Sequence, residues 1–126
     1  MKKMIIILFL ILIHSSSFAA KWDKSDKILF NMFTTGMIID CLQTNYIFTH
    51  NGDGYHEKNS TIKAGVHSIG IGFIPLWFGS FILGSWYVLD KSPAKIRKFT
   101  LVGLILVKGN DCGRNYRKGI GLNFKF

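Results

Sequence analysis

The sequence predicts a small, mainly α-helical membrane protein, with two or three helices that cross or lie on a membrane and a short strand-like C-terminal tail. Three observations predict this class: 48% of the residues are hydrophobic, only 18% are charged, and long uncharged stretches separate the charges. Soluble domains carry roughly 25% charged residues. A length of 126 residues allows one domain at most, so a large multidomain enzyme is excluded.

The amino terminus has the pattern of a bacterial signal peptide. Two lysines precede an apolar stretch at residues 4–13, and the small residues Ser17 and Ala19 follow it. Ten apolar residues are too few to cross the roughly 30 Å of hydrocarbon in a bilayer. We therefore expect residues 1–19 to be cleaved, which leaves residues 20–126 as a single membrane domain. An uncleaved membrane anchor is the alternative.

The segment 66–89 is the strongest candidate for a transmembrane helix, and we expect this helix to cover about residues 64–89. The 24 residues of the segment hold no fixed charge and are enough to cross a bilayer. Pro75 is expected to kink the helix. Trp86 and Tyr87 stand at one end, as aromatic residues do at a membrane interface. The alternative is a buried helix of a soluble core.

A second helix is predicted at about residues 26–49, with Asp40 as the only fixed charge after Lys27. On a helix, residues at the i, i+4, i+7, i+8 spacing share one face. Here that face would hold Gly36, Asp40, Gln43, Thr44 and Ile47. Such a polar stripe suits packing against other helices. An amphipathic helix lying on the membrane surface is the alternative.

A third helix is predicted at about residues 93–110. The Ser-Pro pair at residues 92–93 indicates a helix start, because proline is favoured at the first helical position. Only nine uncharged residues, 99–107, lie between Lys98 and Lys108. The helix therefore either crosses the membrane with its cations toward a polar interior or is half buried. Both interpretations stay open.

A loop at residues 50–63 and a tail at residues 111–126 complete the chain. Residues 119–126 alternate small or polar with apolar side chains and close on Phe126, which predicts a short strand. The same ending resembles the closing strand of bacterial outer-membrane barrels, so a barrel is a rival fold. The alternation that a barrel requires is missing upstream. We therefore prefer the helical fold and the inner membrane.

The net charge of +9 could suggest a nucleic-acid-binding protein, but the distribution of the basic residues argues against it. Nucleic-acid-binding proteins gather basic residues on one face of a soluble fold, whereas here basic residues separate uncharged stretches. The basic tail from Lys108 to Lys125 is expected to meet anionic lipid headgroups. We expect membrane lipids as partners, together with other membrane proteins or further copies of the chain, and no nucleic acid.

Asp40 is the most unusual residue, because an ionisable group at membrane depth is unfavourable unless it is paired. It is a candidate functional residue, and its candidate partners are Arg97, Lys108 and Arg114. The alternative is an ion pair that only joins helices.

No cofactor or metal is expected. The His, Asp and Glu residues of the 50–59 loop match no metal site, and its Asn-Gly and Asp-Gly pairs indicate turns.

Short motifs along the chain carry a family resemblance. They are Asp-x-x-Gln-Thr at 40–44, Tyr-His-Glu-x-Asn at 55–59, Arg97, and Asn-Tyr at 115–116 before the closing Phe126. In these motifs the chain resembles a group of small bacterial and phage-encoded envelope proteins with a signal peptide, an Asp-x-x-Gln-Thr helix and a Glu-x-Asn-Pro-Ile-Leu-Gly turn. Ser60 replaces the proline of that turn here. The resemblance implies no activity, but it implies a set of residues that act together: Asp40, Gln43, Thr44, Glu57 and Asn59.

The leading hypothesis is a small integral membrane protein of the bacterial envelope that works through protein or lipid contacts. Its polar network would comprise Gln43, Thr44, Asn59 and Arg97 beside Asp40. A membrane-embedded enzyme is the rival, with Asp40 or Glu57 as general acid or base and Gln43 and Asn59 orienting a substrate. A pore-forming or lysis protein is a third class, and leakage of dye from expressing cells would distinguish it.

Overall fold

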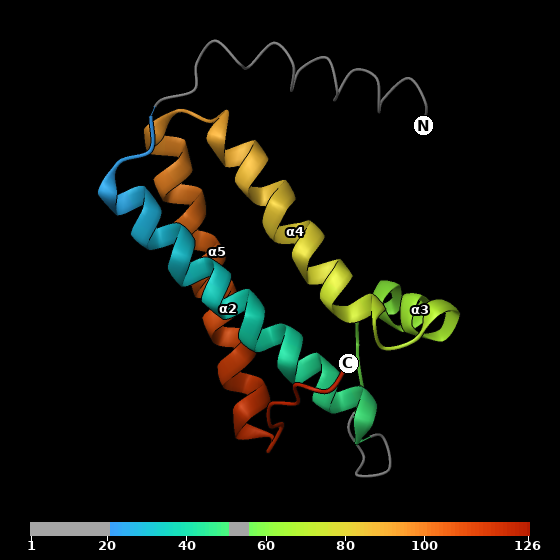
Figure 1. Cartoon of the computed structure of the whole chain (residues 1–126). Coiled ribbons are helices and arrows are strands. Elements are labelled where there is room, and N and C mark those ends of the chain that lie inside the picture. Colours follow the sequence, from blue (N-terminus) through green and yellow to red (C-terminus); the bar gives the residue numbers. More distant parts are fainter. Residues whose placement is uncertain (1–20, 51–55) are drawn as a thin grey trace.

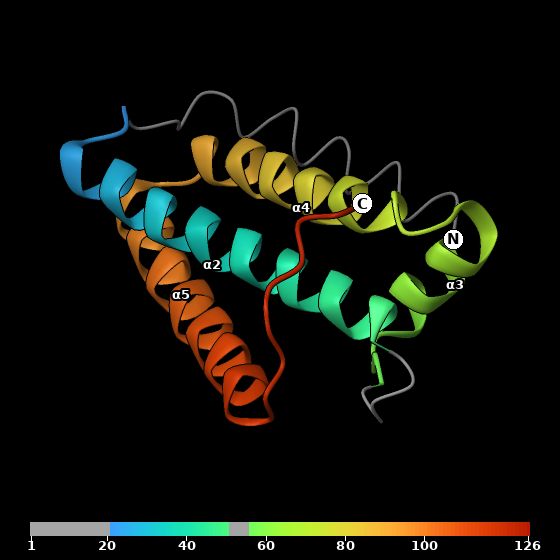
Figure 2. The ribbon, with the colours of Figure 1, turned by 60° about the horizontal axis from the view of Figure 1, so that its bottom comes forward.

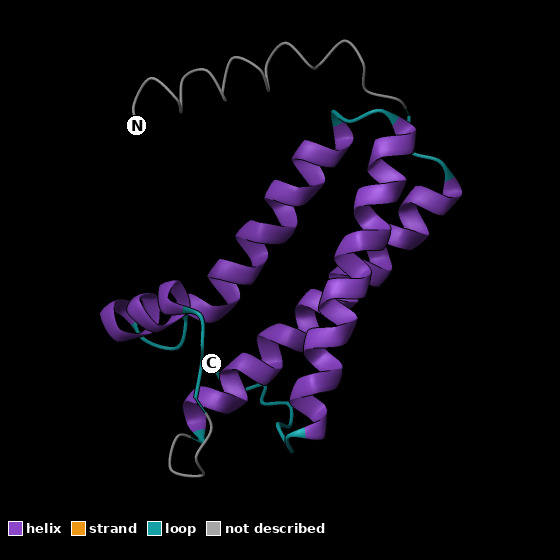
Figure 3. Cartoon of the chain, turned by 180° about the vertical axis from the view of Figure 1, so that it is seen from behind, coloured by secondary structure: helices purple, strands orange, loops and turns teal. Residues whose placement is uncertain are grey.

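The computed structural model describes residues 21–50 and 56–126, and in these ranges the chain forms four helices (Figure 1). They are α2 (Lys24–Thr49), α3 (Ser60–Ile69), α4 (Phe73–Asp90) and α5 (Ala94–Arg117). α2 and α5 run in the same direction and cross, α4 runs antiparallel to them, and α3 lies at the start of α4. The described ranges contain helices and loops but no strand (Figure 3). The prediction of a mainly helical fold is confirmed, while the predicted signal peptide lies outside the described residues.

The start of α2 is fixed by two aspartates that cap each other. The side chain of Asp23 accepts a hydrogen bond of 2.8 Å from the backbone N–H of Asp26, and the side chain of Asp26 accepts one of 3.1 Å from Asp23. This reciprocal capping box satisfies two backbone donors that have no partner inside the helix. α2 therefore begins at Lys24, about two residues earlier than predicted, and it ends at Thr49 as expected.

The segment predicted as one helix over about residues 64–89 is two helices, which corrects that prediction. α3 ends at Ile69 and is followed by Gly70, whose φ of 85° lies in the left-handed region that favours glycine, and α4 begins at Phe73. A Cβ on Gly65 would lie 2.2 Å from the ring of Phe73, so the bend needs a glycine there too. Pro75 lies in the first turn of α4, where its missing N–H removes no helical hydrogen bond. The break is therefore at Gly70 and not at Pro75.

The core lies where α2, α4 and α5 face one another, with one residue from α3. Its buried members are Phe33, Met37, Cys41, Ile62, Ile74, Phe78, Leu89 and Leu101. α2 and α5 come together closely at Gly36, because a Cβ at that position would lie only 3.3 Å from the Cβ of Lys108. The small residue on the predicted polar face of α2 is thus a contact point between two helices.

α5 continues to Arg117, about two turns beyond the predicted end near residue 110. The prediction ended where the uncharged stretch ends, but hydropathy does not determine where a helix stops. Arg114 and Arg117 lie in the last turn of α5, where cations interact favourably with the helix dipole. The second half of α5 is accordingly polar and helical.

The tail after α5 is extended, but in the described chain it pairs with no strand. It turns at Gly119, whose φ is 79°, and then crosses the second half of α2 (Figure 2). The backbone N–H of Asn123 donates to the carbonyl of Leu42 at 3.2 Å. The side-chain amide of Asn45 donates to the carbonyls of Asn123 and Lys125 at 2.9 and 2.7 Å. The predicted strand is therefore an extended segment bound to the side of a helix.

Many large apolar side chains of the described residues are exposed. Among the described residues, α4 is the helix that is long and apolar enough to cross a membrane, and only 17% of it is buried. Further exposed apolar residues lie on the neighbouring helices: Ile28, Met32 and Ile38 on α2, and Ile96, Phe99, Val102, Leu106 and Val107 on α5.

Candidate functional site: a pocket between α2, α4 and α5

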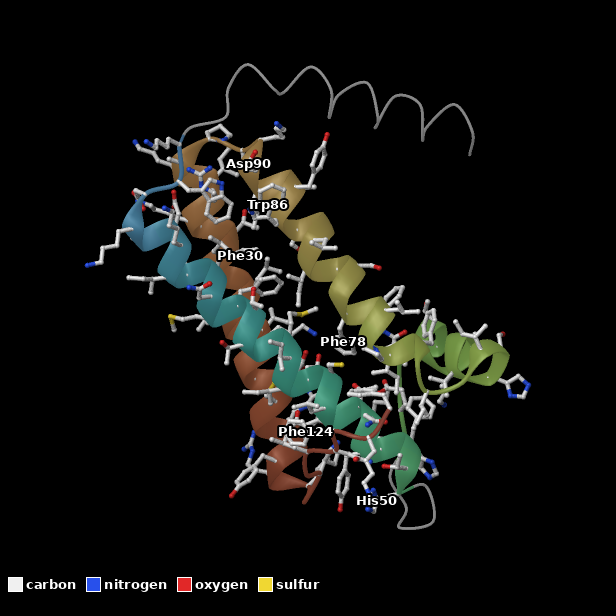
Figure 4. The ribbon with its side chains drawn as sticks, viewed as in Figure 1. Phe30, His50, Phe78, Trp86, Asp90 and Phe124 are labelled. Atoms are coloured by element: carbon white, nitrogen blue, oxygen red, sulfur yellow. The ribbon has the colours of Figure 1, made fainter. Side chains whose placement is uncertain are left out.

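A pocket of about 530 Å³ lies between α2, α4, α5 and the segment that precedes α3. One wall is apolar and includes Trp77, Phe78 and Phe81 of α4. Figure 4 shows Phe78 on the part of α4 that faces α2. Polar and charged groups from three segments also line the pocket and are called its rim below: Asp40 and Thr44, then His56, Glu57, Lys58 and Asn59, then Lys108, Asp111, Arg114, Asn115 and Lys118.

Asp40 pairs with Lys108 across the contact between α2 and α5. The Oδ2–Nζ distance is 2.7 Å, and the side chains of Lys108 and Asp40 are only 21% and 13% exposed. The ammonium of Lys108 also lies 5.9 Å from the centre of the Phe78 ring. Of the three cations considered as partners of Asp40, Lys108 is the one in contact. Arg114 lines the same pocket, whereas Arg97 binds elsewhere.

Gln43 connects α2 to the end of α5, one turn beyond Asp40. Its Nε2 donates to the carbonyl of Cys112 at 3.2 Å, and its Oε1 accepts from Nδ2 of Asn115 at 3.2 Å. Gln43 and Thr44 are buried, and Thr44 and Asn115 line the pocket. The predicted polar face of α2 therefore bonds α5 directly.

Glu57 and Asn59 organise the start of α3 at the edge of the pocket. Oδ1 of Asn59 accepts from the N–H groups of Thr61 and Ile62 at 3.0 and 3.2 Å, which caps the helix. Oε1 of Glu57 accepts from the N–H of Asn59 at 2.7 Å. The loop predicted over 50–63 therefore ends at Asn59, and its residues 51–55 lie outside the described chain. Asp40, Thr44, Glu57 and Asn59 line one pocket, and Gln43 reaches it through Asn115.

Arg97 forms a second polar cluster at the opposite end of the helices. It donates to Oδ2 of Asp26 at 2.8 Å, and neither side chain is exposed at all. The guanidinium also donates to the carbonyls of Leu89 and Lys21, and it lies 4.8 Å from the centre of the Trp22 ring. The indole N–H of Trp22 donates to Asp90 at 2.8 Å. Arg97 thus ties together the start of α2, the end of α4 and the start of α5.

Beside this cluster, Asp23 and Lys98 form an exposed ion pair at 2.5 Å. The hydrogen bond from Lys98 holds the pKa of Asp23 well below its usual value, and the N–H of Asp26 and the hydroxyl of Ser25 act in the same direction. The same pair raises the pKa of Lys98. Both groups therefore stay ionised over the pH range in which proteins are usually studied.

The sequence analysis missed three residues of these clusters: Asp26, Trp22 and Asn45. No role was predicted for Asp26 or Trp22. The signal for Asn45 was present, since a fully buried amide inside an apolar segment needs a partner. That partner is the tail, and nothing in the spacing of the sequence identifies a partner 78 to 80 residues away. No group of metal-binding side chains occurs in residues 21–50 and 56–126.

Comparison of the chain with protein-family models, curated proteins and solved structures finds no match. The resemblance to small envelope proteins therefore stays a prediction. Chemically, the pocket joins an aromatic wall to a mixed-charge rim, an arrangement suited to a ligand with an apolar part and a charged part.

Proposed function

We propose that this protein is a small integral membrane protein of the bacterial envelope that acts through contacts with lipids or other proteins. The observation that carries the proposal is α4, which is apolar, 18 residues long and only 17% buried. At 1.5 Å per residue such a helix is about 27 Å long, close to the roughly 30 Å of bilayer hydrocarbon. An apolar helix that is mostly buried would instead support a soluble core.

The surfaces beside α4 support the same proposal. Phe99 and Leu106 of α5 are 84% and 67% exposed, and Ile28 and Met32 of α2 are about half exposed. Large contiguous apolar patches are rare on monomeric soluble proteins, whereas in a bilayer exposed apolar side chains face lipid. We propose that α2 and α5 cross the membrane beside α4. Each helix has a stretch without fixed charge, called its uncharged band below: residues 28–39 of α2, 73–89 of α4 and 99–107 of α5.

The charges inside the helices fit this environment because they are paired. Asp40 and Lys108 contact each other at the edge of the uncharged bands, and Asp26 and Arg97 contact each other where α2 and α5 begin. Intramembrane ionisable groups are expected to face other helices and to pair with one another. Trp86 is 47% exposed near the end of α4, beside Asp90, as an interfacial aromatic residue would be (Figure 4).

The enzyme hypothesis has one observation in its favour, since Asp40 and Glu57 line the same pocket. Both carboxylates already have other roles: Asp40 pairs with Lys108, and Glu57 accepts from the backbone of Asn59. A general base at either position would have to leave its partner. Contact with lipid or protein is therefore the function we prefer.

Membrane fractionation tests the proposal. After expression of the full chain, inner and outer membranes are separated and each is washed at alkaline pH, which removes peripheral proteins. We expect the protein in the inner membrane and resistant to the wash. Recovery in the soluble fraction or in the alkaline wash would contradict the proposal. Leu83→Asp on the exposed face of α4 should reduce insertion, and the matched change Lys95→Asp, at an already charged position outside the bands, should not.

A further inference from the structure

The pocket between α2, α4 and α5 is lined by uncharged residues in one part and by charged residues in another. Its aromatic wall, Trp77, Phe78 and Phe81, belongs to the uncharged band of α4. Asp40 and Lys108 stand where the bands of α2 and α5 end. Asp111, Arg114 and Lys118 follow Lys108 in the chain, and Glu57 and Lys58 come from the segment before α3. If the helices cross the membrane, the pocket lies at the depth of the phospholipid headgroup and the first part of the acyl chains.

Groups of both signs in the rim are left without an ion-pair partner in the described chain. Asp111 and Arg114 lie three residues apart on one face of α5, Lys118 follows at its C-cap, and all three line the pocket. Lys108 is engaged by Asp40, but no ion pair or hydrogen bond to a side chain of Asp111, Arg114 or Lys118 occurs in residues 21–50 and 56–126. The rim therefore presents both cations and a carboxylate to a ligand.

The aromatic wall and the charges of both signs indicate which class of ligand fits the pocket. A simple anion would meet Asp111 and Glu57 as well as the cations, and an apolar ligand would leave the rim unused. A headgroup with a phosphate and a primary ammonium satisfies both signs, since Arg114 and Lys118 can bind phosphate oxygens and Asp111 can accept from the ammonium. The aromatic wall of α4 then covers the start of an acyl chain.

We propose that this pocket binds a phospholipid whose headgroup carries both a phosphate and a primary ammonium, with phosphatidylethanolamine as the probe. The inference rests on the proposed membrane location and names the lipid that the protein would recognise. Arg114 and Lys118 hold the phosphate, and Asp111 gives the preference for the ammonium.

The test uses the full chain purified in detergent, with bound lipid counted by native mass spectrometry during titration. Three lipids with identical acyl chains are compared: phosphatidylethanolamine, phosphatidylglycerol, which lacks the ammonium, and phosphatidylcholine, whose quaternary ammonium donates no hydrogen bond. We expect phosphatidylethanolamine to bind about tenfold more tightly than either, the effect of one charge-assisted hydrogen bond. Inorganic phosphate is added as a competitor, and we expect it not to displace the lipid.

Variants assign the binding to the pocket. Arg114→Gln is expected to weaken binding of phosphatidylethanolamine about tenfold, and Asp111→Asn to remove the preference over phosphatidylglycerol. Arg117→Gln is the matched control, because Arg117 is an exposed arginine on the same helix but does not line the pocket. Helical content by circular dichroism checks folding, and Lys118→Gln replaces Arg114→Gln if the latter does not fold.

Three results would overturn the inference: equal binding of phosphatidylethanolamine and phosphatidylglycerol, an equal loss in Arg114→Gln and Arg117→Gln, or displacement by inorganic phosphate. If the chain resists the alkaline wash but retains no phosphatidylethanolamine, only this inference fails. If it is found in the soluble fraction, the proposed function fails first.

Discussion

Arg97 donates a hydrogen bond of 2.8 Å to Asp26, and both side chains are fully buried although 71 residues separate them in the sequence. Removing one partner of a buried ion pair leaves an uncompensated charge, which destabilises a protein by about 3–5 kcal/mol. We therefore expect Arg97→Ala to lower the free energy of unfolding by that amount, measured by denaturant titration in detergent.

The double replacement separates the charge from the packing. Replacing both members of a buried pair by apolar residues is often neutral or stabilising, so Asp26→Leu combined with Arg97→Met should recover part of the loss. The part not recovered includes the capping hydrogen bond that Asp26 accepts from the N–H of Asp23. Lys98→Ala, at the neighbouring exposed position, is the control and should have a small effect. A loss in Arg97→Ala no larger than in Lys98→Ala would show that the pair does not hold the helices together.

The pair of Asp40 and Lys108 predicts strong coupling between two helices. Asp40→Asn and Lys108→Gln should each lower the yield of folded protein, because each leaves the partner charge partly buried. In a double-mutant cycle we expect a coupling free energy of about 0.5–3 kcal/mol. Lys95→Gln, also on α5, should show no coupling with Asp40→Asn. Additive effects of Asp40→Asn and Lys108→Gln would mean that the contact at 2.7 Å contributes nothing.

The contact between α2 and α5 depends on the small size of Gly36. An added Cβ would lie 3.3 Å from the Cβ of Lys108, so α2 or α5 has to shift. We expect Gly36→Ala to destabilise the fold by about 1–3 kcal/mol, the usual cost of overpacking. Gly103→Ala on α5 is the matched control, since nothing lies within 4 Å of its added Cβ. Equal unfolding free energies for the two variants would contradict the close approach.

The pKa of Asp23 predicts how stability changes in acid. Because its folded-state pKa lies below the usual 3.8, Asp23 contributes stability that is fully present above pH 3.8 and is lost as the pH falls through the lower value. The midpoint of thermal unfolding of the wild type should therefore exceed that of Lys98→Gln above pH 3.8 and approach it in stronger acid. The difference should also shrink at high salt, since the pair is exposed. A difference that is constant from pH 7 to pH 2 would argue against the ion pair.

Part of the fold was predictable because the positions of charged residues along the chain indicate which segments are apolar and which helix faces are polar. The uncharged stretch before Asp90 and the single charge at Asp40 gave the mainly helical class and the polar face of α2. The ends of the helices were harder to predict. The chain is apolar on both sides of Gly70, so hydropathy does not show that the helix is interrupted there. α5 continued past residue 110 because helix propensity and capping, not hydropathy, decide where a helix ends.

The candidate site was predictable in its residues but not in its partners. The chemistry of Asp40 required a cation, but three cations met that requirement and only the crossing at Gly36 selects Lys108. Alternation in the tail suggested a strand, since extended backbone has the same period whether it pairs with a strand or lies on a helix. The tail lies on a helix because the side-chain amide of Asn45 binds its carbonyl groups, and this tertiary contact is not visible in the sequence of the tail.

The most direct test of the membrane account is cysteine labelling across the bilayer. With Cys41 and Cys112 replaced by alanine, single cysteines at Lys58, Ser92 and Lys125 are treated with a membrane-impermeant maleimide in sealed vesicles of each orientation. Three spans predict that Lys58→Cys and Lys125→Cys react from one side and Ser92→Cys from the other, while Leu83→Cys within α4 reacts from neither. Reaction of Lys58→Cys and Ser92→Cys from the same side would contradict the account.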